Sequence, residues 1–458
     1  MRADLASVAA AIGSQLPDRC DGAVVATGVA IDSRTTQPGD LFVALPGTRT
    51  DGRRFLAAAA ERGAVAAIAP HGPDAATAPL PLLVVAAPGN ALTALAHWWR
   101  GELSARVVGI SGSVGKTTTR RLVAAALGGP SGSVVQSHGN FNNAIGLPLT
   151  ILAADRTTRF LVAELGTGAP GELVPLAELL RPDRSILTAA GPSHLDAFGT
   201  VDAVAREKAT LAAATHESTL VLRDLWPALL PPMPRVRTLA EDDASIAARI
   251  VAGPKPAWPD GQFDPDAGQI AVAVDGDRVV GGFGSHTAPL LAAAYLVAVD
   301  EGEPVEAVCE RLRACRPVAG RGTVRPVAID AGTAAAIDDS YNANPMSVAA
   351  AARTLAAISD GRGHLVLGPM LGLGEQSGRL HEQTGRAIAS LPLARLHTIG
   401  DDAARLAKSA GHPHTSYDNA EAAAAALRAT LPDRSTFLVK GSRATRMERV
   451  LDQFEDAD

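Results

Sequence analysis

The stretch GISGSVGKTTTR, residues 109–120, decides the fold because it places a glycine-rich turn between two regular segments. The β-branched run ARVVGIS leads into it, and the Ala/Leu-rich run TTTRRLVAAALGG follows it. This order predicts a buried strand, a turn and the N-terminus of a helix. Backbone N–H groups and the positive end of the helix dipole then converge on an anion, so we predict a nucleotide phosphate site.

Two side chains of the same stretch strengthen this prediction. Lys116 adds a full positive charge, and the hydroxyl of Thr117 can bind Mg²⁺. Ile110 stands where a strict Walker pattern has its first glycine, and the glycines present are Gly109, Gly112 and Gly115. A dinucleotide fingerprint does not place Lys-Thr-Thr after its last glycine, and a plain glycine turn has no use for the lysine.

Length and composition indicate a soluble globular chain of about three domains. The chain has 458 residues, of which 47% are hydrophobic and 20% charged, which excludes a disordered protein. Its net charge is −6 without a long basic run, so we expect no nucleic-acid partner. Three cysteines are too few for a disulfide framework or a zinc site. The N-terminal residues lack a signal-peptide core and no uncharged apolar stretch reaches about 18 residues, so we expect no membrane span and a cytoplasmic location.

The order of strand-like and helix-like segments predicts an α/β protein with mainly parallel sheets. Residues 1–98 form a small N-terminal α/β module in this interpretation. Residues 99–316 form a central ATPase domain of the P-loop type with a mainly parallel sheet, and residues 317–458 form a Rossmann-like α/β domain.

Candidate site residues lie downstream of the glycine loop. Glu164 follows the apolar run RFLVA, His194 follows SILTAA, and Asp338 and Asp339 end the strand-like run AAAI. In open α/β sheets, ligands bind beyond the carboxyl ends of the strands. Lys208 lies in the helical stretch AVAREKATL. Each has an ordinary alternative as a loop acid, a structural histidine, a turn residue or a solvated lysine, so none decides the function alone.

Together, several segments resemble the Mur ligase family. They are GISGSVGKTTT, GNFNNAIGLPLT, ELGTGAPGEL, GPSHLDAFG, AREK, IDDSYNANPMS and LVKGSRATRME. The front stretch IDSRTTQPGDLFVALPGTRTDGRRF is similar to the family's uridine-binding module. IDDSYNANP and GNFNNAIGLP are specific to the branch that joins D-Ala-D-Ala to UDP-MurNAc-tripeptide.

The resemblance implies an ATP-dependent acid–amine (peptide) ligase that forms ADP. ATP converts a carboxylate into an acyl phosphate, and an amine then displaces phosphate through a tetrahedral intermediate. Phosphoryl transfer of this kind depends on positioning and on charge neutralisation. The implied reaction belongs to peptidoglycan precursor synthesis, and the implied partners are small molecules. We expect a monomer.

The resemblance also implies roles for individual residues. Lys116 holds the β- and γ-phosphates, Thr117 and Glu164 bind one Mg²⁺, and His194 helps to bind a second. Lys208 carries a carbamate derived from CO₂, which replaces its cation with an anionic Mg²⁺ ligand. The other implied ATP contacts are Gly112, Ser113, Gly115, Thr118, Asn140, Arg321 and Asp339. The implied substrate contacts are Ser33 and Arg34 on the uridine side, and Asn342, Asn344, Lys440, Ser442 and Arg443 in the last domain.

By the same resemblance, the first domain binds the UDP-linked substrate, and the last domain lies on the amine side. Closure of the last domain on ATP would exclude water from the acyl phosphate, which would otherwise hydrolyse.

The chain departs from the family's pattern on the base and amine sides. In GSHTAPLLAAAY, which contains His286, Thr287 and Leu290 occupy positions where the family has asparagines that contact adenine. A leucine cannot donate to or accept from a base edge. The remaining departures are Pro369 and Gly372 in place of two acids, Thr210 in place of an acid after Lys208, and Arg53 in place of a histidine.

These departures leave two alternatives open. The first is a paralogue in specialised metabolism that joins a different carboxylate to a different amine. The second is a non-catalytic nucleotide-binding protein with a regulatory or scaffold role. A pure binder has no need of both metal sites, so the presence of all the expected metal-site residues favours an enzyme.

Overall fold

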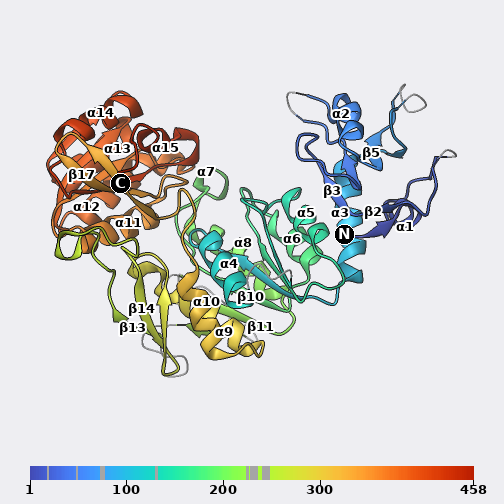
Figure 1. Ribbon diagram of the computed structural model, residues 1–458, viewed down its shortest axis with the longest axis horizontal. Coiled ribbons are helices and arrows are strands. Elements are labelled where there is room, and N and C mark those ends of the chain that lie inside the picture. The colour runs from blue at the N-terminus through green and yellow to red at the C-terminus, as the bar shows by residue number, and fades with distance from the viewer. Residues whose placement is uncertain are drawn as a thin grey trace.

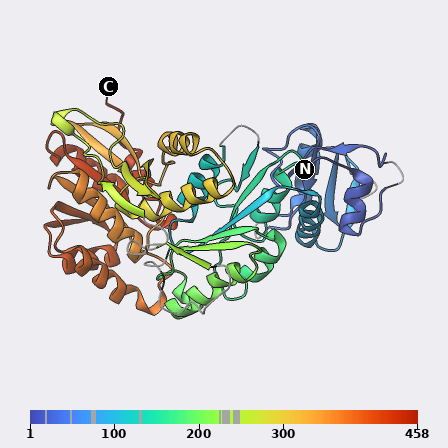
Figure 2. The same cartoon turned by 90° about the horizontal axis from the view of Figure 1, so that it is seen from below.

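The computed structural model describes residues 1–17, 20–47, 50–72, 78–128, 133–222, 226, 236–239 and 248–457. Three α/β units follow one another along the molecule, with the N-terminal and C-terminal units at opposite ends (Figure 1). The central unit lies between them in both views (Figures 1 and 2). The predicted fold class is confirmed.

The N-terminal unit is built on a four-stranded parallel sheet in the order β3-β4-β5-β6. Its strands are β3 (Gly28–Ala30), β4 (Asp40–Val43), β5 (Ala66–Pro70) and β6 (Leu82–Val85). A two-stranded antiparallel sheet adds β1 (Ala3–Asp4) and β2 (Val25–Ala26), and the helices are α1 (Leu5–Ile12), α2 (Leu56–Glu61) and α3 (Pro88–Glu102). Pro88 starts α3 at a position where a missing N–H costs nothing.

Helix α3 joins the first two units. Its residues Leu92, Leu95 and Trp99 are fully buried in a core that also includes side chains of the central sheet. The Trp99 indole N–H donates to the Ala154 carbonyl at 2.9 Å. Residue 98, where we place the first domain boundary, lies within this helix, and residue 316 lies between α10 and β16.

The central unit contains a six-stranded sheet, entirely parallel among the described residues, in the order β12-β11-β10-β7-β9-β8. The strands are β7 (Arg106–Ser111), β8 (Val134–Gln136), β9 (Phe160–Glu164), β10 (Arg184–Leu187), β11 (Ser218–Leu222) and β12 (Val236–Leu239). Both faces are covered by helices, which explains why β9 is buried at every position.

The helices of the central unit divide between the two faces of this sheet. One face carries α3, α5 (Gly146–Ala153), α6 (Leu173–Leu180) and α8 (Val201–Ala213). The other carries α4 (Lys116–Ala126), α9 (Ala288–Asp300) and α10 (Val305–Ala314). The short helix α7 (Leu195–Phe198) precedes α8. Almost every side of α9 is buried, in keeping with its apolar sequence.

A small antiparallel sheet, absent from the sequence predictions, packs against α9 and α10. It consists of β13 (Ala248–Ala252), β14 (Ile270–Val274) and β15 (Asp277–Gly281). Asp275 and Gly276 join β14 to β15, and both have positive φ, of 48° and 93°. An Asp-Gly pair between apolar runs is a strong hairpin signal, and it was present in the sequence.

The C-terminal unit contains a six-stranded sheet in the order β16-β17-β21-β18-β19-β20. The strands are β16 (Thr323–Ile329), β17 (Gly332–Asp338), β18 (Gly363–Leu367), β19 (Leu393–Ile399), β20 (His414–Tyr417) and β21 (Thr436–Lys440). The β16–β17 pair is antiparallel, and the other pairs are parallel. Helices α11 (Pro345–Ile358), α12 (Ser377–Ile388) and α13 (Asp401–Ala410) cover one face, and α14 (Ala420–Thr430) and α15 (Glu448–Leu451) cover the other.

The arrangement brings the carboxyl ends of β7, β9 and β17 toward the junction of the central and C-terminal units. Among the helices that the structure describes, none has the length and apolar character needed to span a membrane.

Candidate active site

The predicted phosphate loop lies between β7, which ends at Ser111, and α4, which begins at Lys116. Gly112 and Gly115 have positive φ, of 152° and 84°. A Cβ on Gly112 would lie 2.0 Å from the Thr188 Oγ1 and 2.9 Å from the Ala189 nitrogen, so the loop admits no side chain there. The strand, turn and helix therefore occur as the sequence predicts.

The residues after β10 hold this loop in place. The Ser113 N–H donates to the Ala189 carbonyl at 2.6 Å, and the Thr188 hydroxyl donates to the Val114 carbonyl at 2.5 Å. The Lys116 ammonium folds back over the loop and donates to the Gly112 carbonyl at 2.8 Å. The loop is therefore shaped by protein contacts before a phosphate arrives, which is the preorganisation that electrostatic catalysis requires.

Glu164 is the acidic centre of the site. It ends β9 beside Ile110 of β7 and is only 3% exposed. The Thr117 hydroxyl donates to its Oε2 at 2.9 Å, and the Asn142 amide donates to its Oε1 at 2.9 Å. The predicted neighbours Thr117 and Glu164 are thus in direct contact.

Lys208 and His194 lie close to the loop lysine. Lys208 projects from α8 and is 2% exposed, and burial together with the Lys116 cation lowers the pKa of Lys208 to about 7. Burial and the positive charges of Lys208 and Lys116 also lower the pKa of His194. Among the described residues, no hydrogen bond reaches the Lys208 ammonium group. Lys116, Lys208 and His194 therefore lie close enough for their charges to act on one another.

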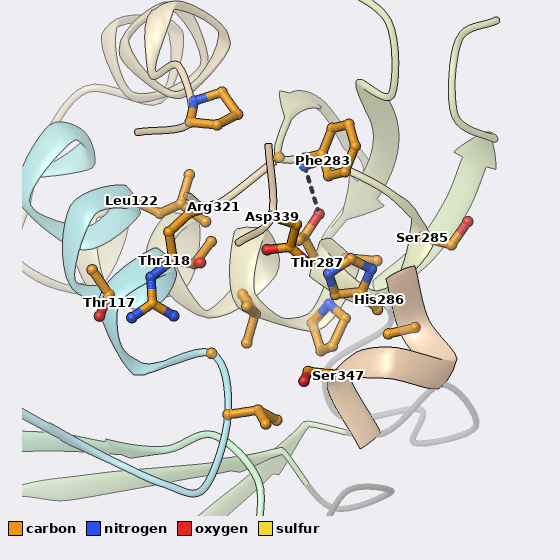
Figure 3. A pocket seen from close by; sticks show the side chains of 18 of the residues that line it. Thr117, Thr118, Leu122, Phe283, Ser285, His286, Thr287, Arg321, Asp339 and Ser347 are labelled. Carbon is orange, nitrogen blue, oxygen red and sulfur yellow. Dashed lines mark hydrogen bonds between the residues drawn. The ribbon is translucent and has the colours of Figure 1, made fainter. Parts of the chain in front are cut away.

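A cavity of about 630 Å³ extends from the phosphate loop between the central and C-terminal units. In Figure 3, Thr117 and Thr118 lie on one side of this cavity, and Ser285, His286 and Ser347 lie on the other. Ser113, Gly115, Arg321, Asp339, Asn342, Asn344 and Lys440 also line it. Its size is that of a small-molecule or cofactor site.

The end of the cavity at the start of α9 lacks the family's asparagines. The Thr287 hydroxyl donates to the Gly284 carbonyl at 2.8 Å and accepts from the Phe283 N–H at 3.1 Å. Leu290 packs against the phosphate loop, where its Cδ1 would lie 3.2 Å from a Cβ on Gly115. The Thr287 side chain therefore stabilises the turn of residues 283–287, and the Leu290 side chain packs against the phosphate loop.

His286 is one of the polar side chains at this end, where Ser285, Ser347 and Arg353 also line the cavity. Its ring is open to the cavity although protein surrounds it. Its Nδ1 lies 3.4 Å from the Thr354 Oγ1, whose hydroxyl donates to the Ala350 carbonyl at 3.1 Å. Burial, with the charges of Lys440 and Arg353, lowers the pKa of His286 to about 4, so the ring is neutral near pH 7.

The C-terminal unit supplies a second group of charges. The Lys440 ammonium, 3% exposed, pairs with the Asp339 Oδ2 at 2.6 Å. Burial raises the pKa of Asp339, and the Lys440 cation opposes that shift. Arg321 lies over the Tyr341 ring at 4.3 Å, and Arg443 lies 5.5 Å from the same ring. Arg321 comes from the linker before β16, Asp339 and Tyr341 follow β17, and Lys440 ends β21 with Arg443 shortly after it. Arg321, Asp339 and Lys440 line the cavity.

Three predicted substrate residues have structural contacts of their own. Asn344 caps α11 and forms a capping box with Ser347. The Ser442 hydroxyl accepts from the Leu371 N–H at 2.8 Å, and Arg443 also pairs with Glu448 at 3.0 Å. These contacts fix the local backbone.

Ser33 and Arg34 do not line the nucleotide cavity. Ser33 is 8% exposed, whereas the Arg34 side chain is 85% exposed and pairs with Asp32 at 2.6 Å. Both belong to the N-terminal unit. Arg53, one of the departures, pairs with Asp51 at 2.7 Å in the same unit.

The central and C-terminal units touch beside His194. The Leu195 N–H donates to the Gly372 carbonyl at 2.9 Å, and the Gln376 amide donates to the Gly199 carbonyl at 3.0 Å. Gly372, which replaces an acid of the family's pattern, has φ of 73°. The departure thus lies in the contact between the two units.

Sequence reasoning missed Asn142, Ser137, Thr188 and Arg120. It selected Asn140 from GNFNN, yet the Asn140 side chain is exposed and Asn142 is the residue that contacts Glu164. The signal for Asn142 was available in the same motif, because the two asparagines are two residues apart.

Family models match the chain in each of its three parts. The Mur ligase family catalytic domain matches residues 25–94, the Mur ligase middle domain residues 110–226, and the Mur ligase glutamate ligase domain residues 320–443. The UDP-N-acetylmuramoyl-tripeptide–D-alanyl-D-alanine ligase of Mycobacterium tuberculosis is 33% identical over 93% of this chain and 91% of that protein. The chain belongs to the Mur ligase family.

Two solved structures of the Mur ligase family support the same fold. MurF from Acinetobacter baumannii has a TM-score of 0.83 at 24% identity and covers 99% of this chain and 98% of its own. MurF ligase from Thermotoga maritima, solved in complex with ADP, has a TM-score of 0.76 at 27% identity and covers 93% of this chain and 96% of its own.

Proposed function

We propose that this chain is an ATP-dependent, ADP-forming ligase of the MurF type. It joins D-alanyl-D-alanine to UDP-N-acetylmuramoyl-tripeptide in the synthesis of the peptidoglycan precursor. One observation carries the proposal: a phosphate loop whose Thr117 contacts the buried Glu164, beside a buried lysine, Lys208, that forms no ion pair among the described residues. The relatives' names and the ADP complex of the Thermotoga maritima protein support it.

In this proposal the loop binds the triphosphate. The N-terminus of α4 and the Lys116 ammonium neutralise the β- and γ-phosphates, and the amides of Gly112 and Gly115 donate to them. Ser113 lies between these glycines and shapes the loop, because its own N–H donates to the Ala189 carbonyl. Arg321 adds a cation from the linker, and Asp339 lies where ribose hydroxyls can donate to it. Thr118 and Asn140 approach from the sides of the loop.

The residues present fit Mg²⁺ and a carbamate on Lys208. The Thr117 hydroxyl and the Glu164 carboxylate contact each other, and both are oxygen ligands of the kind that Mg²⁺ prefers. In this proposal the His194 imidazole, which lies near Lys116, helps to bind a second ion. A lysine with its pKa lowered to about 7 is partly neutral near pH 7, and only a neutral amine can take up CO₂. When bound, two Mg²⁺ ions would neutralise charge on the transferred phosphoryl group, and the carbamate would turn Lys208 into one of their ligands.

The other units complete the reaction. We assign uridine-nucleotide binding to residues 1–98 through Ser33 and Arg34, ATP binding to residues 99–316, and the amine side to residues 317–458. The contact between Gly372 and Leu195 holds the C-terminal unit against the central unit beside His194. Closing the site there protects the acyl phosphate from water until the amine attacks. Asn342, Asn344, Lys440, Ser442 and Arg443 lie on the amine side in this assignment.

A second candidate is a paralogue that uses the same chemistry on another acid and amine. The loop that carries Pro369 and Gly372 favours it, because two acids are missing from the side on which a cationic amine would approach. The phosphate end is unaffected by these changes, so the two candidates share the ATP-dependent step.

The deciding experiment mixes the purified chain with ATP, Mg²⁺, a panel of UDP-muramoyl peptides and a panel of dipeptides. The proposal predicts phosphate release that requires both UDP-MurNAc-tripeptide and D-Ala-D-Ala, with a product heavier by one dipeptide minus water. Product with other acids or amines alone would favour the paralogue. ATP binding without an amide product in any combination would refute both.

A further inference from the structure

Arg120 lies one helical turn beyond Lys116 in α4, and the reaction proposed above assigns it no role. Its side chain is only 5% exposed. It forms no ion pair with a carboxylate in the part of the chain that the structure describes, and its Nε has no hydrogen-bond partner there. A buried guanidinium that forms no ion pair is costly, so its position calls for an explanation. The Glu164 carboxylate acts on it through space and partly offsets that cost.

The guanidinium is used to hold a loop. Its NH1 donates to the carbonyls of Ser137 and Gly139, the second at 3.2 Å. These carbonyls belong to residues 137–142, which lie between β8 and α5 and include GNFN of the stretch GNFNNAIGLPLT. Arg120 therefore ties the phosphate-loop helix to this segment.

The same segment holds Glu164 at two points. The Ser137 hydroxyl accepts from the Glu164 N–H at 3.0 Å, which fixes the backbone at the end of β9. The Asn142 amide donates to the Glu164 Oε1 at 2.9 Å, and the Asn142 carbonyl accepts from the Gly166 N–H at 2.7 Å. The orientation of the Glu164 carboxylate toward Thr117 thus depends on residues 137–142 staying in place.

We propose that Arg120 is a positioning residue, which holds residues 137–142 so that Ser137 and Asn142 aim the Glu164 carboxylate at Thr117 and at a divalent cation. The inference rests on the proposed function, because it takes Glu164 as a ligand of Mg²⁺. Groups that orient a metal ligand commonly change metal affinity or activity by about 10- to 100-fold when removed. Arg120 acts through Glu164 and touches no substrate.

The test compares Arg120→Met with a matched control, Arg100→Met. Arg100 is also a buried arginine, 9% exposed, and it donates to three backbone carbonyls, those of Leu180, Leu103 and Arg181. It lies in α3 and has no contact with Glu164. Both variants lose a buried cation and leave carbonyls unpaired, so they share any general loss of stability.

Four quantities are measured for each protein: kcat, KM for ATP, the Mg²⁺ concentration at half-maximal rate, and hydrogen exchange of the amides in residues 137–142. For Arg120→Met we expect the half-saturating Mg²⁺ concentration to rise and kcat to fall, each about tenfold or more, with faster exchange in that segment. For Arg100→Met we expect all four to stay at the wild-type values, although the melting temperature falls. Arg120→Lys keeps the charge but not the planar fork, so we expect it to lie between wild type and Arg120→Met.

Equal Mg²⁺ dependence in Arg120→Met and Arg100→Met, with an active wild type, would overturn this inference and leave the proposed function standing. A wild type that shows no Mg²⁺-dependent ligation would instead defeat the proposed function. If Arg120→Met does not fold, Arg120→Lys decides: a severalfold rise in half-saturating Mg²⁺ supports the positioning role, and an unchanged value contradicts it.

Discussion

The two ends of the nucleotide cavity are built in different ways. At the phosphate end, backbone geometry dominates: Gly112 admits no side chain, the Thr188 hydroxyl holds the loop, and Thr117 and Glu164 contact each other directly. At the start of α9, the polar atoms of Thr287 are used within its own turn, and Leu290 packs under the loop.

The difference indicates what each end requires. Phosphoryl transfer requires anion-binding amides, a cation and metal ligands held in a fixed geometry, so few substitutions at this end are compatible with the chemistry. A purine base offers flat apolar faces as well as polar edges, so a wall that combines apolar side chains with a polar side chain such as His286 can replace an asparagine. We therefore expect substitutions at the phosphate end to abolish turnover or to lower kcat strongly. We expect substitutions at the other end to raise KM for ATP.

The largest effect is expected for Lys208→Ala. The substitution removes the amine that would carry the carbamate. No other described side chain takes over this anionic role at the same position. We expect ADP-forming turnover to fall below detection while the far-UV circular dichroism spectrum stays that of a folded protein. Wild-type rates in this variant would show that turnover does not require a carbamate on Lys208. They would also contradict the expectation that substitutions at the phosphate end reduce turnover most.

Lys116→Met is expected to have the next largest effect. The substitution keeps the length of the side chain but removes the charge that neutralises the γ-phosphate, and kcat should fall by about 100-fold or more. Phosphate release at saturating ATP measures it. The control is Lys255→Met, since Lys255 is a half-exposed lysine that pairs with Asp266 away from the cavity and should leave kcat unchanged. A loss confined to KM would mean that Lys116 contributes binding alone.

The pKa of Lys208 leads to a pH effect on stability. Because the folded-state pKa, about 7, lies below the usual 10.5, the unfolded chain binds more protons between these values, and the free energy of unfolding rises with pH across that window. Denaturant unfolding from pH 7 to pH 10 in metal-free, CO₂-free buffer measures it. Lys208→Ala should lose this part of the rise. If the free energies of unfolding of the two proteins change in parallel with pH, the pKa of Lys208 is not lowered in the folded protein.

Much of the phosphate end could be predicted from the sequence because its determinants are local. The glycines, Lys116 and Thr117 stand within one strand–turn–helix segment, and their positions follow from backbone geometry. Contacts made by strand order could not be predicted in the same way. Lys440 meets Asp339 only because β21 pairs with β17, and Asn142 meets Glu164 only through the path of residues 137–142.

For the end of the cavity at the start of α9, the sequence predicts only which contact is missing. The sequence shows that Leu290 cannot contact a base edge, but not that the Thr287 hydroxyl is already used or that His286 faces the cavity. The hairpin of β14 and β15, whose Asp-Gly signal stands in the sequence, leads into part of this wall, because Gly282, Phe283 and Ser285 directly after β15 line the cavity.

His286→Ala is therefore the sharpest test of that end. The Nδ1 side of the ring faces Thr354, and the rest of the ring is open to the cavity. We expect KM for ATP to rise about three- to tenfold with kcat nearly unchanged, as for the loss of one neutral hydrogen bond. Thr287→Val, which removes a hydroxyl used only by the turn, should leave KM for ATP unchanged. If Thr287→Val raises KM for ATP and His286→Ala does not, the Thr287 hydroxyl contacts the base in the nucleotide complex.

The smallest effect is expected for Asn344→Ala, and it separates a cap from a substrate contact. Asn344 caps α11 as Asn419 caps α14, each side chain accepting an N–H of the first turn, at 2.9 Å and 2.8 Å. Each alanine variant should lower the free energy of unfolding by about 1 kcal/mol. If Asn344 only caps, the two variants share the same KM for the amine substrate. A rise in that KM for Asn344→Ala alone would assign its side chain to the amine site as well, because the matched loss of a cap at Asn419 accounts for the structural part.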